Sequence, residues 1–351
     1  MKNAISDGNI IIVAGFQGVV KGTSRVSTLG RGGSDLTAVA IAGAIEADVC
    51  EIYTDVDGIY TTDPRIEPKA KKLDKISYDE MLELASLGAK VLQNRSVEMA
   101  KKLNVNLVSR SSFTPEVEGT LITKEENIME KPVVSGIALD KNQVRVGMYG
   151  VTDRPGIASS IFTALADANI NVDMIVQTVG VDGKTDLDFT IPRTDWEICK
   201  GVMEKFKNET ENIDYNEKIC KVSIVGVGMK SHTGVASKAF TAMASENINI
   251  RIISTSEIKI SMIIEEKYAE LAVRVLHDAY ELEVKDYVLI CYMEYGWNVQ
   301  LSHTQIWGLN THEHEKFNTD EWRKFDEWVA NNPPRLTLKR ELLKMKLRII
   351  G

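Results

Sequence analysis

The fold is indicated most strongly by GIASSIFTALADANINVDMI, residues 156–175. This stretch aligns without gaps to GVASKAFTAMASENINIRII, residues 234–253, and the two are identical at 11 of 20 positions. Chance alone gives about one identity in a stretch of this length, so the two segments are copies of one module. In each copy an apolar helical pattern leads through Asn-Ile-Asn into a short apolar run that is typical of a strand.

Strand patterns flank both copies of the repeat. Each copy has one strand pattern before it, another after it, and then a closing helix. This β-α-β-β-α order is the core of a ferredoxin-like module. We therefore expect two βαββαβ modules, over residues 133–215 and 219–285. The flanking strand patterns are VRVGMYGV (144–151), KVSIVGVG (221–228), LDFTIP (187–192) and IKISMII (258–264).

Strand and helix patterns also alternate before the repeat, which indicates an α/β domain with a parallel sheet. Residues 10–14 have the pattern of a buried strand. A glycine-rich loop and an apolar helix over 36–47 follow, with Ser34 as the expected N-cap. Ser77 and Glu80 have the spacing of a capping box at the start of the next helix. Further strand patterns cover 49–54, 105–110 and 119–123.

The composition is that of an ordinary globular protein, with 44% hydrophobic and 26% charged residues among 351. The net charge of -8 argues against nucleic acid as a partner, because phosphates require a concentrated basic surface. The four cysteines form no CxxC pair, so we expect no disulfide framework, no metal site and a cytoplasmic location. No segment approaches the ~20 apolar residues that span a bilayer, so we expect no membrane partner.

Two polar motifs before the repeat are candidates for chemistry. LGRGGSD (29–35) lies where a loop meets a helix start, and the free N–H groups and dipole there favour an anion. YTDVDGIYTTDPR (53–65) follows a strand pattern and combines hydroxyls, carboxylates and an arginine, which suits nucleotide phosphates. Either motif alone is also compatible with a solvated turn.

In order along the chain, GFQG, these two motifs, SYDEMLELASLGAKVL and SRSSF resemble the aspartate kinases of the amino-acid kinase family. The repeat resembles the paired ACT modules of that family, and the resemblance covers about residues 8–285. It implies the C-terminal half of an amino-acid kinase domain over 1–126. It further implies phosphoryl transfer from ATP, with Mg²⁺, to the side-chain carboxylate of L-aspartate, the first step towards lysine, threonine and methionine. Another amino-acid kinase, acting on glutamate, carbamate or a nucleotide, agrees less well with TTDPR and the repeat.

The resemblance also implies roles for single residues. Asp35 matches the family's catalytic aspartate. Because the acceptor carboxylate is already ionised at pH 7, catalysis depends on cations and helix N-termini more than on a strong base. The substrate loop matches Arg31, Gly32, Gly33 and Ser34. The ATP-binding residues match Thr54, Asp55, Tyr60, Arg65, Lys90 and Val91.

The ACT resemblance implies a homodimer formed through these modules and an amino-acid effector, lysine or threonine, bound between modules. Arg251 stands in the second copy where the first has Asp173, so we expect two unequal sites. Effector contacts in the first copy match Asp153, Arg154, Pro155, Gly156, Ile157, Ala158, Asn171, Val172, Asp173 and Gln177. Those in the second copy match Asn249, Ile250, Ser256 and Glu257.

Three features depart from the family pattern. The 351 residues contain no Lys-Phe-Gly-Gly-Thr-Ser segment, whose lysine neutralises the transferring phosphoryl group in the family. We therefore expect a chain that opens midway through the kinase domain and has little activity alone; the alternative is a non-catalytic, amino-acid-sensing regulatory subunit. Gln93-Asn94 stand where many relatives carry His-Pro. Residues 286–351 contain no third repeat, and we expect a tail outside the family pattern.

Overall fold

The computed structural model describes residues 1–86, 91–128, 132–178, 182–283, 289–292 and 298–301. The chain divides into two units, Met1–Glu283 and Val284–Gly351. In the second unit the described residues form two antiparallel strands, β13 (Leu289–Tyr292) and β14 (Asn298–Leu301). The rest of the predicted tail lies outside the described residues. Within the part that is described, no helix has the length and apolar character needed to cross a bilayer.

A four-stranded sheet organises the region before the repeat. Strands β3 and β5 pair in parallel, as do β4 and β6, whereas β5 and β6 pair antiparallel. The helices α2, α3 and α4 contribute Val39, Met81 and Val97 to one apolar core with Leu107 of the sheet. The strands, in sheet order, are β3 (Cys50–Thr54), β5 (Leu107–Ser111), β6 (Thr120–Thr123) and β4 (Lys75–Ser77). The helices are α2 (Gly33–Ile45), α3 (Tyr78–Ser86) and α4 (Asn94–Leu103).

The predicted buried strand over 10–14 is wrong. The segment has no regular secondary structure, and Ile10 and Ile12 are each 94% exposed. Among the described residues no strand pairs with it, so no ladder forms and no second layer covers its side chains. The chain instead begins with helix α1 (Lys2–Ser6), and the glycine-rich loop contains a hairpin of β1 (Gln17–Val19) and β2 (Val26–Thr28).

The sequence predicted the start of α3 correctly but not the cap of α2. Gly32, at φ +68°, is the N-cap of α2, and Ser34 lies inside the first turn, so the predicted cap is wrong. The left-handed backbone at this position favours glycine. The capping box of α3 is confirmed. The Ser77 N–H donates to the Glu80 carboxylate at 3.1 Å, and the Glu80 N–H donates to Ser77 Oγ at 3.2 Å.

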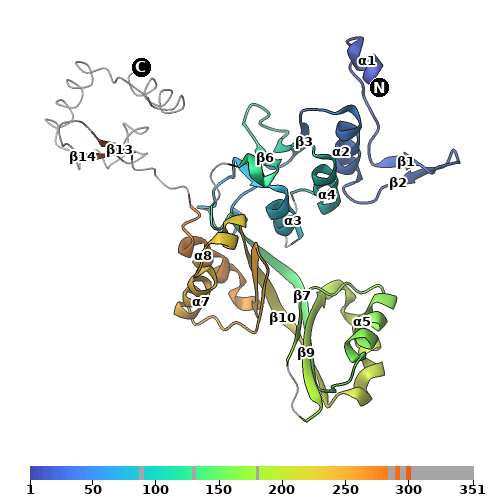
Figure 1. The fold of residues 1–351 in the computed structure, drawn as a ribbon, viewed down its shortest axis with the longest axis vertical. Coiled ribbons are helices and arrows are strands. Elements are labelled where there is room, and N and C mark those ends of the chain that lie inside the picture. The colour runs from blue at the N-terminus through green and yellow to red at the C-terminus, as the bar shows by residue number, and fades with distance from the viewer. Residues whose placement is uncertain (87–90, 129–131, 179–181, 284–288, 293–297, 302–351) are drawn as a thin grey trace. The chain divides into compact units, whose positions relative to one another are not determined.

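Both repeats share one six-stranded antiparallel sheet, in the order β11-β12-β10-β7-β9-β8. Strands β7 and β10 are 17 and 14 residues long and run through both modules (Figure 1). The strands are β7 (Gly136–Thr152), β8 (Ile175–Gln177), β9 (Lys184–Pro192), β10 (Asn212–Val225), β11 (Ile252–Thr255) and β12 (Lys259–Glu265). Helices α5 (Ile157–Asp167) and α6 (Trp196–Met203) belong to the first module. Helices α7 (Val235–Ser245) and α8 (Ala269–Ala279) belong to the second.

The pairing of β7 and β10 shows how each module obtains its fourth strand. Residues 145–149 of β7 pair with 212–216 of β10 in the first module. Residues 136–140 of β7 pair with 221–225 of β10, which also pairs with β12 in the second module. The second module therefore takes a strand from the chain that precedes the first module. Both modules reach the βαββαβ plan, and the predicted fold class is confirmed. We propose that the second domain comprises residues 133–140 together with 219–283.

Candidate nucleotide and effector sites

A cavity of about 760 Å³ opens where β3 and β5 end, and the loop that follows β3 forms most of its lining. The carboxyl ends of parallel strands are the usual place for a ligand in α/β sheets. Thr54 and Ser111, the last residues of the two strands, both line the cavity. Lys90 lies outside the described residues. The predicted ATP-binding residues that the cavity brings together are Thr54, Asp55, Tyr60, Arg65 and Val91.

Hydrogen bonds within the loop hold its charged side chains. The Tyr60 hydroxyl donates to Asp57 Oδ1 at 3.0 Å, and burial is the main reason that the pKa of Tyr60 is raised. Arg65 binds Asp63 through two bonds, Nε to Oδ1 at 3.0 Å and Nη2 to Oδ2 at 2.7 Å. Hydrogen bonding from Arg65 lowers the pKa of the Asp63 carboxyl. The Arg65 side chain is largely exposed, and an exposed ion pair of this kind contributes little to stability.

The predicted substrate loop is not part of the cavity lining. Asp35 lies in the first turn of α2, and burial raises the pKa of its carboxyl. Arg95 of α4 fastens the loop, because its Nη2 donates to the carbonyls of Leu29 at 2.8 Å and Arg31 at 3.0 Å. The structure therefore separates the predicted residues into two groups. The loop residues Arg31, Gly32, Gly33 and Ser34, with Asp35, stand at the start of α2, apart from those of the cavity lining.

Gln93 contacts the substrate loop, a role that the sequence did not reveal. A Cβ atom added to Gly32 would lie 1.8 Å from Gln93 Cγ. The side chain of Gln93, the N-cap residue of α4, thus packs directly on a glycine whose φ of +68° already disfavours other residues. The sequence signal was the Gln93-Asn94 departure, but only the structure shows which group occupies that space.

The predicted effector residues of the first module gather around the start of α5 and the edge strand β8. Gly156, at φ +92°, is the N-cap of α5. Arg154 pairs with Glu209 at 3.1 Å. Ile157 is buried in the module core and Val172 packs against that core, so these two side chains support the site from within. The exposed members are Asp153, Arg154, Pro155, Gly156, Asn171, Asp173 and Gln177, and Ala158 is half-buried.

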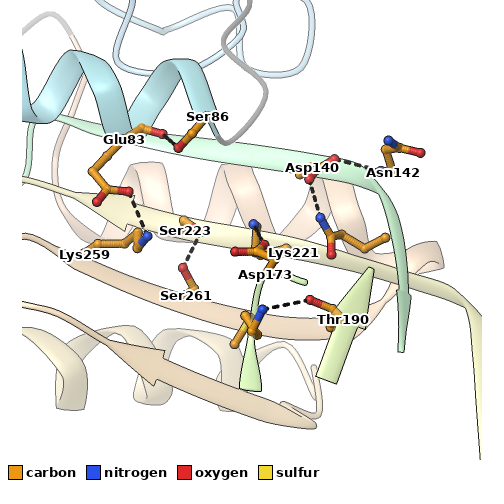
Figure 2. Close-up of polar contacts among 12 residues, drawn as sticks. Glu83, Ser86, Asp140, Asn142, Asp173, Thr190, Lys221, Ser223, Lys259 and Ser261 are labelled. Atoms are coloured by element: carbon orange, nitrogen blue, oxygen red, sulfur yellow. Dashed lines mark hydrogen bonds and ion pairs between the residues drawn. The ribbon is translucent and has the colours of Figure 1, made fainter. Parts of the chain in front are cut away.

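Asp173 is already engaged in an ion pair. Lys221 of β10 directs its Nζ at the Asp173 carboxylate (Figure 2). The Lys221 side chain is only 4% exposed, so the pair is partly buried. Figure 2 also shows the contact of Ser223 with Ser261 and that of Lys259 with Glu83. The contacting atoms lie 2.7 Å apart in the first pair and 2.8 Å apart in the second. One oxygen of the Asp173 carboxylate, Oδ2, is therefore already bound to Lys221.

The corresponding residues of the second module have different partners. Arg251, at the position of Asp173, pairs with Glu265 at 2.8 Å. Glu257 lies 3.7 Å from Lys230. Among the remaining predicted residues, Asn249 and Ser256 are exposed and Ile250 is half-buried. The two copies thus present opposite charges at equivalent positions.

The described residues contain one group of metal-ligand type, Glu67, His277 and Asp278, whose ligand atoms lie within 4.8 Å of one another. A lysine ammonium group already lies beside these residues. Lys69 Nζ lies 3.8 Å from Asp278 and 3.4 Å from Glu283. His277 also uses its Nε2 in a contact with Thr61 at 3.0 Å. We therefore assign this group to the packing of α8 against the loop that follows β3, residues 55–66, which we call the nucleotide loop because the resemblance places ATP-binding residues in it.

Comparisons with known proteins agree with this architecture. A family model described as the amino acid kinase family matches residues 1–108, and ACT domain models match 144–207 and 222–280. The aspartokinase of Helicobacter pylori is 66% identical over 279 residues, which are 78% of this chain and 68% of that protein.

Two solved structures of E. coli aspartokinase III are also similar. One, in complex with aspartate and ADP, has a TM-score of 0.65 at 30% identity; the match covers 76% of this chain and 59% of the solved chain. The other, in complex with lysine and aspartate, has a TM-score of 0.62 at 31% identity; the match covers 75% of this chain and 58% of the solved chain. With the predicted modules, their order and a relative at this identity all in agreement, the chain belongs to the aspartokinase family, a family of kinases with ACT domains.

Proposed function

We propose that this chain serves the ATP-dependent phosphorylation of the L-aspartate side chain, in the cytoplasm, as the first step towards lysine, threonine and methionine. The observation that carries the proposal is the cavity after β3, in which five residues assigned to ATP from the sequence line one space. The similar E. coli aspartokinase III was solved with aspartate and ADP, which supports the same ligands here.

The side chains of the cavity suit a magnesium nucleotide. Asp55, Asp57 and Asp63 supply the oxygen atoms that Mg²⁺ prefers, and the Thr54 hydroxyl donates to Asp55 at 3.0 Å. Bound Mg²⁺ would neutralise phosphate charge as the acceptor approaches. Arg65 would exchange Asp63 for a phosphate oxygen. At the start of α2, Arg31 and the helix N-terminus would hold an aspartate carboxylate, and Asp35 would orient the substrate ammonium.

A purified polypeptide of residues 1–351 is expected to have at least ~10²-fold less aspartate kinase activity than the Helicobacter pylori relative. Its 351 residues contain no Lys-Phe-Gly-Gly-Thr-Ser segment, and Ile10 and Ile12 are exposed. A coupled assay of aspartate-dependent ADP production measures this.

The matched experiment adds the N-terminal segment of the relative in trans. Activity that appears with this added segment, and disappears when the lysine of its Lys-Phe-Gly-Gly-Thr-Ser sequence is replaced by alanine, identifies residues 1–126 as part of a kinase domain. No activity in the mixture, together with amino-acid binding, identifies the alternative regulatory subunit. Full activity of the chain alone would contradict the prediction.

We also propose that the ACT pair binds lysine or threonine and forms a homodimer. The N–H groups at the start of α5 suit an α-carboxylate, and Asp153 is exposed beside them to accept an ammonium group. The edge strands β8 and β11 carry Ile175 and Ile253 at equivalent repeat positions, 51% and 43% exposed. Exposed apolar side chains on open sheet edges favour pairing with a second copy.

Calorimetry is expected to show heat for one of these two amino acids with the wild-type chain, and binding at least about tenfold weaker with Asp153→Ala, because a charged hydrogen bond is lost. Ile175→Lys is expected to shift sedimentation from dimer to monomer, whereas Ile198→Lys, an exposed position on α6 (Ile198 is 55% exposed), leaves the dimer intact. Unchanged binding by Asp153→Ala, or an unchanged dimer with Ile175→Lys, would contradict the respective assignment.

A further inference from the structure

Helix α8 of the second ACT module reaches the nucleotide loop through one buried side chain. His277 is fully buried and its Nε2 lies 3.0 Å from Thr61 Oγ1. Thr61 is also buried. It stands between Tyr60 and Thr62, which both line the cavity, but it is not part of the lining itself. Its side chain is therefore directed at the regulatory module, while its two neighbours face the nucleotide space.

Thr61 Oγ1 contacts two groups. The Lys71 N–H donates to it at 3.0 Å. A hydroxyl oxygen can accept two bonds and donate one, so a neutral His277 imidazole bonds to Thr61 in either direction: the hydroxyl donates to Nε2, or an Nε2–H donates to the hydroxyl. Burial lowers the pKa of His277, which agrees with a neutral ring.

Backbone contacts make the second module one wall of the cavity. The Thr61 carbonyl accepts a bond from the Ile137 N–H at 2.7 Å. Ile137, Ala138 and Leu139 line the cavity and belong to the part of β7 that completes the second module. Arg274 of α8 donates from Nε to the Ile66 carbonyl at 3.0 Å. The loop is thus held at both ends of the segment that contains Thr62 and Arg65.

We propose that His277 is a positioning residue for nucleotide binding, and that the second ACT domain forms part of the nucleotide site through it. This inference rests on the proposed function of the cavity. Loss of the imidazole leaves the buried Thr61 hydroxyl without its partner on α8, and the loop moves to find another. Tyr60 and Arg65 then leave their places in the lining. Nucleotide affinity is in this way linked to the position of α8.

The test is calorimetric titration of the full chain with MgADP. His277→Leu and Thr61→Val are each expected to weaken binding about tenfold, and the double variant no further, because both remove the same bond. His277→Gln, whose side-chain amide can donate or accept a bond near the place of Nε2, is expected to restore binding to within about threefold of wild type. Met243→Ala serves as the control, because Met243 is a fully buried core residue of the same module that lies on α7 and not on α8.

The outcomes separate this inference from the proposed function. Wild-type affinity in His277→Leu and Thr61→Val overturns the positioning role while leaving the nucleotide site in place. An equal loss in Met243→Ala also overturns it, since module stability alone then explains the effect. Absence of MgADP binding in the wild-type chain removes the nucleotide assignment of the cavity and this inference with it.

Discussion

Replacing Glu80 with alanine is expected to destabilise the Met1–Glu283 unit by about 3 kcal/mol or more. Glu80 is 2% exposed, and its carboxylate accepts four hydrogen bonds. Two come from Ser77 of the capping box, at 3.1 Å from the N–H and 2.7 Å from the hydroxyl. The other two come from the Ser135 hydroxyl at 2.5 Å and the Val227 N–H at 2.9 Å. Alanine leaves all four donors buried without this acceptor.

The same substitution is expected to uncouple two regions. Ser135 and Val227 belong to the chain around the second ACT module, whereas Glu80 lies on α3 of the kinase region. Urea unfolding followed by circular dichroism should change from one transition to two. Asp79→Ala, at the residue next to Glu80, is the control. It removes an exposed ion pair with Lys101 and should cost less than about 1 kcal/mol. A Glu80→Ala midpoint equal to that of the control would contradict the prediction.

Asp173→Ala is expected to cost about 3–5 kcal/mol, because it leaves the Lys221 ammonium buried without a counter-charge. Lys221→Met is expected to be much milder, since it removes the buried charge and leaves Asp173 on the more exposed side of the pair. The double variant should therefore be more stable than Asp173→Ala alone. Thermal or urea unfolding of the three variants measures this order.

The order of stabilities of these variants distinguishes a buried ion pair from a surface ion pair. If Asp173→Ala and Lys221→Met cost the same, the pair behaves as a surface ion pair and the buried-charge argument is wrong. Lys221→Met also frees the Asp173 carboxylate, so the variant separates a structural role of Asp173 from ligand binding. Stronger lysine binding in Lys221→Met would assign Asp173 to the effector site, and unchanged binding would assign it to the module contact.

Local signals in the sequence predicted local structure well where the partner lies nearby. The duplicated segment predicted both ACT modules, and the Ser77–Glu80 spacing predicted the start of α3, because caps and amphipathic faces depend on neighbours within a few residues. Residues 10–14 had an equally clear strand pattern, yet they form no strand among the described residues. A strand depends on a ladder partner, and its own apolar pattern contains no information about whether that partner is present.

The order of the modules and the family could be predicted from the sequence alone. Which segments meet depends on the tertiary structure. It gives the second module a strand from residues 136–140, and it places His277 on Thr61, Lys221 on Asp173 and Gln93 on Gly32. Alternation and periodicity identify which face of an element is buried, but many apolar faces fit one another. The choice among them is made by the packing and hydrogen bonding of the whole chain.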